Sequence, residues 1–154
     1  MEIKLRHSGR LDPNTLERLV TAETEIHGDS GWRCWEVPIF AEYGRNYIFE
    51  TDNGFIGSAQ LIRDWDNPET VYLAGFGLEP ARQGHGLGTR CLALLLDDLA
   101  AEDVRAVELT VAPDNDAAMK IYAGAGFKVV DRHDAKYGPG EDRLIMRVDI
   151  KGKQ

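Results

Sequence analysis

The chain has 154 residues and a formal net charge of −8 at neutral pH. This acidic balance argues against nucleic acid or an anionic membrane as the main partner. The two cysteines, Cys34 and Cys91, are too few for a disulfide framework. They also lack the C-x-x-C spacing of zinc sites, so we expect no metal. The N-terminus has no apolar core and no stretch approaches 18 apolar residues, which predicts a cytoplasmic protein with a single domain over residues 1–154.

The N-terminal half predicts strands and helices joined by turns. The expected elements are a strand at 2–7, helices at 11–28 and around 35–44, and strands at 46–50, 55–63 and 70–78. Asp12 followed by Pro13 is typical of a helix start. Asn53-Gly54 between two β-rich runs is a strong hairpin signal.

The C-terminal half predicts alternating helices and strands. The expected elements are a helix from 87 to about 101, a strand at 106–111, a helix at 114–127, and strands at 128–137 and 143–150. Cys91 falls on the apolar face of the first helix, so we expect it in the core. The full order, β-α-α-β-β-β-α-β-α-β-β, predicts the α/β class: a three-layer α/β/α domain around a mixed, largely antiparallel sheet.

The segment LEPARQGHGLGTR at residues 78–90 places three glycines within five positions between a strand and a helix. A tight turn would explain them in part. A dinucleotide-binding fingerprint would need glycine at Thr89 or Cys91, and a Walker A loop would need lysine after Gly88, so both are excluded. What remains is an anion site, because backbone N–H groups at a helix N-terminus hold a pyrophosphate and glycines let it approach.

Two motifs together resemble a known family. The string Gln83-x-x-Gly86-x-Gly88 resembles the pyrophosphate loop, Q/R-x-x-G-x-G/A, of the GCN5-related N-acetyltransferase (GNAT) superfamily. The string from Asn115 through Tyr122 to Gly126-Phe127 is similar to the family's second signature. The resemblance is close over residues 71–150, where the chain is most similar to acetyltransferases of protein N-termini, the ribosomal-protein type.

The resemblance implies an acetyl-CoA site. Its expected residues are Phe76, Gly77 and Leu78 on the strand, Gln83, Gly84, His85, Gly86, Leu87, Gly88 and Thr89 in the loop, and Asn115 and Tyr122 on the later helix. Asn115 also fits the role of a helix cap. Tyr122 is expected to act as the general acid that protonates the departing thiolate, since a phenol near pKa 10 and a thiol near 8.5 are closely matched.

The general base is where the chain departs from the family's pattern. Similar N-terminal acetyltransferases have a glutamate five residues before the asparagine, and Thr110 occupies that position here. Glu108, on the same face of the strand, and Glu69, before the preceding strand, are the candidate bases. Near neutral pH a lysine-type amine loses its proton at a cost of about 4 kcal/mol, whereas an α-amine costs about 1 kcal/mol or less. A weak base therefore favours a low-pKa amine.

We therefore predict an acetyl-CoA-dependent N-acetyltransferase that transfers acetyl directly to a primary amine in a ternary complex. The acceptor is expected to be a peptide N-terminus or an amine-bearing small molecule, and a non-catalytic acyl-CoA-binding domain is the alternative. Trp32, Trp35 and Tyr137 are the candidate acceptor-binding residues. His7 and His27 carry no functional signal, and either a monomer or a homodimer fits the sequence.

Overall fold

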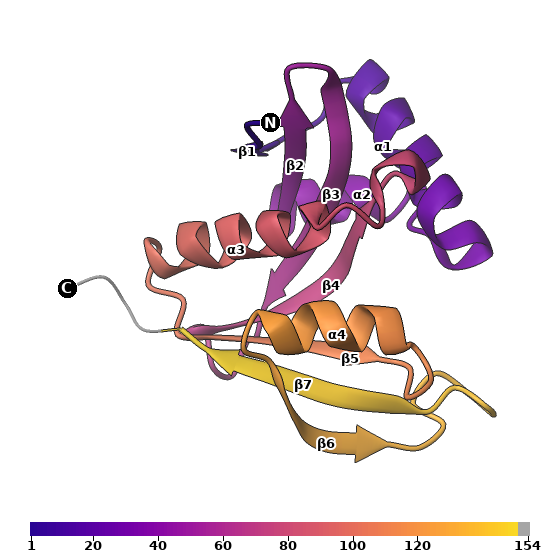
Figure 1. The fold of residues 1–154 in the computed structure, drawn as a ribbon, viewed down its shortest axis with the longest axis vertical. Helices are drawn as coiled ribbons and strands as arrows, with labels where there is room; N and C mark the ends of the chain where they lie inside the picture. The colour runs from indigo at the N-terminus through magenta and orange to yellow at the C-terminus, as the bar shows by residue number, and fades with distance from the viewer. Residues whose placement is uncertain (151–154) are drawn as a thin grey trace. The chain divides into compact units, whose positions relative to one another are not determined.

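The computed structural model describes residues 1–150. Its helices and strands are β1 (Lys4–His7), α1 (Pro13–His27), α2 (Val37–Tyr43), β2 (Arg45–Thr51), β3 (Gly54–Arg63), β4 (Thr70–Leu78), α3 (Leu87–Ala100), β5 (Ala106–Val111), α4 (Asp116–Gly124), β6 (Lys128–His133) and β7 (Arg143–Asp149). Short 3-10 turns lie at Gly28–Ser30 and Pro80–Arg82. The order of elements predicted from the sequence is confirmed (Figure 1).

Seven strands form one sheet in the order β1-β2-β3-β4-β5-β7-β6. The β1–β2, β2–β3, β5–β7 and β6–β7 pairs are antiparallel, and the β4–β5 pair is parallel. The predicted α/β class with a mixed, largely antiparallel sheet is therefore confirmed. The described residues divide into two compact units: the first holds residues 1–62 and 73–91, and the second holds residues 63–72 and 92–150.

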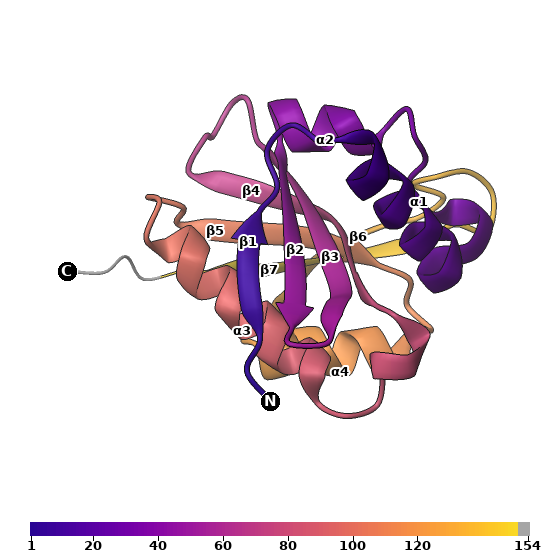
Figure 2. The same cartoon turned by 90° about the horizontal axis from the view of Figure 1, so that it is seen from above.

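In the first unit, local signals fix both ends of α1. The Asp12 carboxylate accepts a hydrogen bond from the Thr15 backbone N–H at 2.8 Å, which confirms the predicted cap. Gly28 ends the helix with a φ of 59°. The helix buries Leu19 against Val37 of α2 and Ile48 of β2. Through this apolar packing, α1 and α2 lie beside the strands β1, β2 and β3 (Figure 2).

The β2–β3 hairpin turns at Asn53 and Gly54, as predicted, and Gly54 has a φ of 102°. Along β3, a Cβ atom at Gly57 would lie 2.4 Å from the Gly77 carbonyl oxygen of β4. Only glycine at position 57 therefore lets these two backbones approach, so this position is fixed by packing.

In the second unit, β5 alternates as expected. Val107, Leu109 and Val111 are buried, while Glu108 and Thr110 lie on the opposite, half-buried face. At the end of the sheet order, all six residues of β6 are exposed, and its register against β7 shifts between Val129 and Asp131. The two half-buried polar positions on β5 are the ones that sequence analysis connected with catalysis.

Candidate active site

In the first unit, the glycine loop is tied to the end of β4. The Gln83 side-chain amide donates a hydrogen bond to the Leu78 carbonyl at 2.9 Å. The Glu79 backbone N–H donates to the Ile56 carbonyl at 2.8 Å, and the Glu79 carboxylate pairs with Arg18. These contacts hold both ends of the turn, so Gln83 has a structural role in addition to any contact with a ligand.

The loop then opens directly into α3. Gly84 and Gly86 have φ values of 80° and 74°. Residues other than glycine adopt this left-handed backbone conformation only with strain. The Gly86 carbonyl accepts from the Arg90 N–H at 3.4 Å, which places the loop at the helix N-terminus. The first N–H groups of a helix have no intrahelical partner and, with the helix dipole, attract an anion. The local geometry thus matches the predicted pyrophosphate site, whose contact with acetyl-CoA stays a prediction.

The aromatic residues predicted for the acceptor differ in burial. Trp32 is half-buried, with its ring 4.9 Å from that of Phe40. Trp35 is 82% exposed and is free for contact with a partner. Cys34 between them is an exposed free thiol, whereas Cys91 is fully buried, as expected for a core residue.

In the second unit, α4 carries the two polar residues of the second motif. The Asn115 side chain caps the helix by accepting from the Ala118 N–H at 3.2 Å. The Tyr122 ring packs 5.7 Å from that of Phe127. Burial raises the pKa of the Tyr122 phenol to about 12, so it stays protonated near neutral pH and remains a hydrogen-bond donor. Its role as the general acid stays a prediction.

The two carboxylates proposed as bases are unequally placed. Glu108 accepts a hydrogen bond from the Arg147 guanidinium at 3.0 Å, so its carboxylate is already engaged within the chain. Glu69 is exposed, and its main-chain carbonyl accepts from the Arg105 N–H at 2.8 Å at the start of β5. Thr110 lies near the other end of β5, so Glu69 is not beside the position that carries the base in similar enzymes.

Three hydroxyl groups meet at Thr110. The Tyr72 hydroxyl lies 3.0 Å from the Thr110 hydroxyl and 3.3 Å from that of Tyr137, and the last two lie 3.4 Å apart. Burial raises the pKa of Tyr72 to about 12, whereas the hydrogen bonds from Thr110 and Tyr72, with Lys136 and Arg143 nearby, outweigh desolvation and lower the pKa of Tyr137. Sequence reasoning missed Tyr72, although its alternation along β4 could have placed it opposite β5.

This hydroxyl cluster borders a cavity of about 410 Å³. Its lining residues are Tyr72, Glu108, Thr110, Val130, Asp131, His133, Lys136 and Ile145. Tyr137, at the rim of the cluster, is 56% exposed and has the Arg143 guanidinium 5.2 Å from its ring centroid. The predicted acceptor residue Tyr137 therefore lies among polar side chains that can bind a polar ligand.

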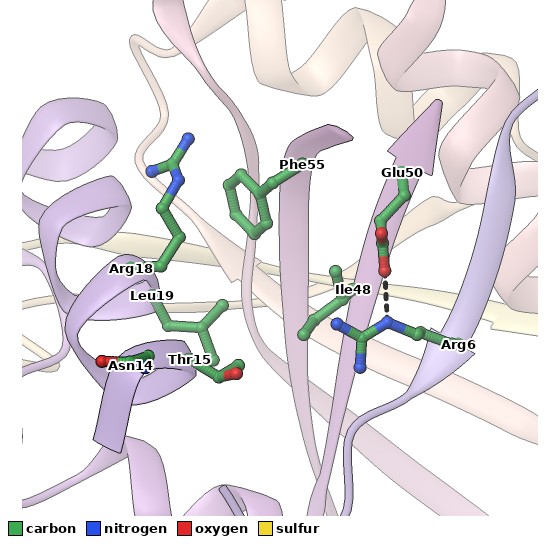
Figure 3. A pocket seen from close by; sticks show the side chains of 8 residues that line it. All are labelled: Arg6, Asn14, Thr15, Arg18, Leu19, Ile48, Glu50 and Phe55. Atoms are coloured by element: carbon green, nitrogen blue, oxygen red, sulfur yellow. Dashed lines mark hydrogen bonds and ion pairs between the residues drawn. The ribbon is translucent and has the colours of Figure 1, made fainter. Parts of the chain in front are cut away.

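A second cavity, of about 220 Å³, lies in the first unit (Figure 3). It is lined by Arg6, Asn14, Thr15, Arg18, Leu19, Ile48, Glu50 and Phe55. Arg6 is paired with Glu50, and the Arg18 guanidinium lies 4.4 Å from the centroid of the Phe55 ring. Since both arginines are engaged within the chain, this cavity offers an anion little net attraction.

Neither a membrane span nor a metal site emerges from residues 1–150. None of the helices in that range has the length and hydropathy needed to cross a bilayer. The same residues contain no group of three or more His, Cys, Asp or Glu side chains placed to hold a metal ion.

The family is decided by a comparison with family models. The model described as the acetyltransferase (GNAT) family matches residues 14–127. The chain belongs to the GNAT family. The family predicted from the glycine loop and the second motif is thus confirmed, and the match extends through the N-terminal half, which the motifs left open. GNAT acetyltransferases use acetyl-CoA as the acetyl donor.

Two relatives and two solved structures illustrate this membership. N-alpha-acetyltransferase RimI of Mycobacterium tuberculosis is 43% identical over 107 residues, covering 68% of this chain and 66% of that protein. L-2,4-diaminobutyric acid acetyltransferase of Nocardia farcinica is 31% identical over 80 residues, covering 52% of this chain and 42% of that protein. The chain thus spans between two fifths and two thirds of the length of these relatives.

The solved structures share the fold. The ribosomal-protein-S18-alanine N-acetyltransferase of Escherichia coli matches with a TM-score of 0.81 at 21% identity, over 99% of this chain and 97% of that one. A Bacillus subtilis acetyltransferase in complex with CoA matches with a TM-score of 0.77 at 13% identity, over 97% and 100% of the two chains. At these identities the likeness establishes the GNAT fold alone.

Proposed function

We propose that this protein transfers an acetyl group from acetyl-CoA to a primary amine by direct attack in a ternary complex. The observation that carries the proposal is the glycine loop: two left-handed glycines open α3 in a chain of the GNAT family. Backbone N–H groups from Gly84 to Thr89 would bind the pyrophosphate. Main-chain groups of Phe76, Gly77 and Leu78 would bind the pantetheine arm and the acetyl carbonyl, with Asn115 as a further donor.

The chemistry follows from these assignments. The neutral amine attacks the thioester carbonyl carbon, the C–S bond breaks, and CoA leaves as a thiolate. Tyr122 donates a proton, or a strong hydrogen bond, to that thiolate. The nitrogen loses one proton, so the products are the acetylated amine and CoA.

We further propose an α-amine as the acceptor, in a peptide or a small molecule. Thr110 replaces the glutamate base of similar enzymes, and this loss penalises an amine of high pKa more than an α-amine. The likeness to RimI, an N-alpha-acetyltransferase, supports a peptide. The likeness to an L-2,4-diaminobutyric acid acetyltransferase keeps a small amine as the second candidate.

An acceptor screen tests this function. Peptides with free or blocked N-termini, free amino acids, diamines and polyamines would be incubated with the enzyme and acetyl-CoA, and CoA release measured. Turnover that requires a free α-amine supports the proposal. Turnover only with side-chain amines or polyamines contradicts the α-amine assignment. Tight acetyl-CoA binding without turnover on any amine points to an acyl-CoA-binding domain instead.

A further inference from the structure

A buried cluster in the first unit packs against β4 at two glycines. Its centre is Glu23 of α1, which is 3% exposed despite its charge. One carboxylate oxygen, Oε2, accepts a hydrogen bond from the Trp32 backbone N–H at 3.1 Å and lies 4.0 Å from Nε2 of His27, one helical turn further along. Burying a carboxylate costs free energy, and buried carboxylates are rare unless another polar group lies beside them. The burial of Glu23 next to His27 therefore points to a role for the two side chains together.

His27 connects this pair with β4. It is the last residue of α1, and a third of its side chain is exposed, so solvent and ligands reach it. A Cβ atom built at Gly77 would lie 3.2 Å from His27 Nε2 and 2.6 Å from Ile26 Cγ2. The imidazole therefore lies over the β4 backbone at the residue proposed to bind the acetyl group.

A second polar group points to the same strand. Gln60 is 1% exposed and is held by its amide nitrogen, which donates to Asn46 at 2.9 Å and to Ser58 at 3.2 Å. In the part of the chain from 1 to 150, its Oε1 has no hydrogen-bond partner. A Cβ atom at Gly75 would lie 2.4 Å from this oxygen and 2.7 Å from Trp32 Nε1. Such an oriented, unpaired acceptor fits an N–H donor of a ligand.

We propose that His27 is the general base of acetyl transfer, with Glu23 as the nearby carboxylate that stabilises the imidazolium formed when His27 takes the proton. The inference rests on the proposed function and supplies the base that Thr110 does not. As the amine nitrogen attacks the thioester carbon, its proton passes to His27 Nε2 and from there to solvent. CoA leaves as the thiolate, which takes its proton from solvent.

The electrostatics of the pair fit this role. Burial lowers the pKa of His27, so its imidazole is neutral near pH 7 and has a lone pair available. Burial raises the pKa of Glu23 to about 6, so the carboxylate is ionised at the same pH. Glu23 faces the imidazole from α1, whereas β4 presents Gly77, which does not titrate. Once protonated, the imidazolium is stabilised by the carboxylate beside the nitrogen that received the proton.

The test compares three variants with the wild type: His27→Gln, Glu23→Gln, and the control His7→Gln on β1. CoA release with an α-amine peptide gives kcat and KM, and calorimetry gives acetyl-CoA affinity. His27→Gln is expected to lower kcat by about 10²–10⁴-fold, as for loss of a general base, and to abolish the acidic limb of the kcat/KM–pH profile. Its acetyl-CoA affinity should stay within twofold. His7→Gln should leave all of these values within twofold.

Two further measurements separate a base from a packing residue. Exogenous imidazole should restore part of the activity of His27→Ala, since the cavity left by the ring admits it. NMR titration of the wild type should give His27 a pKa below 6.5, and Glu23→Gln should shift that pKa further down by removing the carboxylate. A wild-type His27 pKa above 7, or a His27→Gln kcat within threefold of wild type, would overturn the inference.

The outcomes also distinguish this inference from the proposed function. Normal wild-type turnover with an unaffected His27→Gln variant refutes the base and leaves the acetyltransferase intact. A wild type that neither binds acetyl-CoA nor releases CoA with any amine refutes both.

Discussion

Replacing Tyr122 by phenylalanine removes one hydroxyl and keeps the ring that packs 5.7 Å from Phe127. The fold should therefore survive, with a change in the free energy of unfolding of about 1 kcal/mol or less. If the proposed mechanism holds, kcat falls because the departing thiolate loses its donor. Acetyl-CoA affinity changes little, since the hydroxyl acts mainly on the charge that develops as the C–S bond breaks.

The structure sets the size of this effect. Burial raises the pKa of Tyr122 to about 12, against roughly 8.5 for a thiol, so complete proton transfer is uphill by about 5 kcal/mol. Tyr122 should then act mainly as a hydrogen-bond donor to the thiolate. A hydrogen bond to a charged group contributes about 1.5–3 kcal/mol, which corresponds to roughly 10–200-fold in rate. Since general acids contribute about 10²–10⁴-fold, we expect a loss near 10²-fold.

Single-turnover release of CoA measures this step directly. Tyr43→Phe is the matched control, because Tyr43 is 87% exposed at the end of α2. The high pKa of Tyr122 also predicts that activity does not decline through its ionisation below about pH 10, because at pH 9 roughly one phenol in a thousand is ionised. A variant as stable as wild type with single-turnover rates within threefold would refute the donor role and leave Tyr122 as a packing residue.

Three other predictions address the loop, the acceptor and the buried carboxylate. Gly86→Val should weaken acetyl-CoA binding at least tenfold by calorimetry, whereas Gly9→Val, with a similar left-handed φ and equally open surroundings, should cost comparable stability and leave affinity unchanged; equal affinities would contradict the pyrophosphate site. Replacing Trp32 and Trp35 by alanine should lower kcat/KM for the acceptor at least tenfold. Trp65→Ala is the control, because the Trp65 side chain is 98% exposed. If kcat/KM stayed unchanged for every acceptor, neither Trp32 nor Trp35 would belong to the acceptor site. Glu23 has a folded pKa of about 6 against a model value of 4.5, so the native state binds its proton more tightly and stability should fall by up to about 2 kcal/mol as pH rises from 4.5 through 6. Glu23→Gln should remove that slope in urea unfolding, and an unchanged slope would assign the pH dependence to other groups.

Local signals in the sequence were sufficient for the order of elements. Asp12 and Asn115 cap their helices, and Asn53-Gly54 makes the hairpin turn, because each acts through its own backbone and near neighbours. The glycine loop was predictable for the same reason: the left-handed backbone at Gly84 and Gly86 is a property of the local chain. The roles of these residues toward acetyl-CoA and the single-domain assignment stay predictions.

Groups assembled by tertiary contacts were harder to predict. The Tyr72, Thr110 and Tyr137 hydroxyls meet only through the register of β4 on β5 and the course of the chain after β6. Glu23 carried a usable signal, since it lies four residues after Leu19 on the apolar face of α1, where a charged side chain is unusual. His27 carried no such signal, because its proposed role depends on its position beside Gly77, fifty residues further along the chain.

The exposed strand β6 bears on how copies of this chain behave at high concentration. An outer strand offers unpaired N–H and C=O groups on which another polypeptide can build, and Val129 and Val130 are about half exposed. The register shift between Val129 and Asp131 interrupts the regular repeat of those groups. The charged side chains of Asp131 and Arg132, both exposed, lie at this shift. Strand addition from a neighbouring copy would meet a kinked, charged template, which protects the protein against edge-to-edge aggregation.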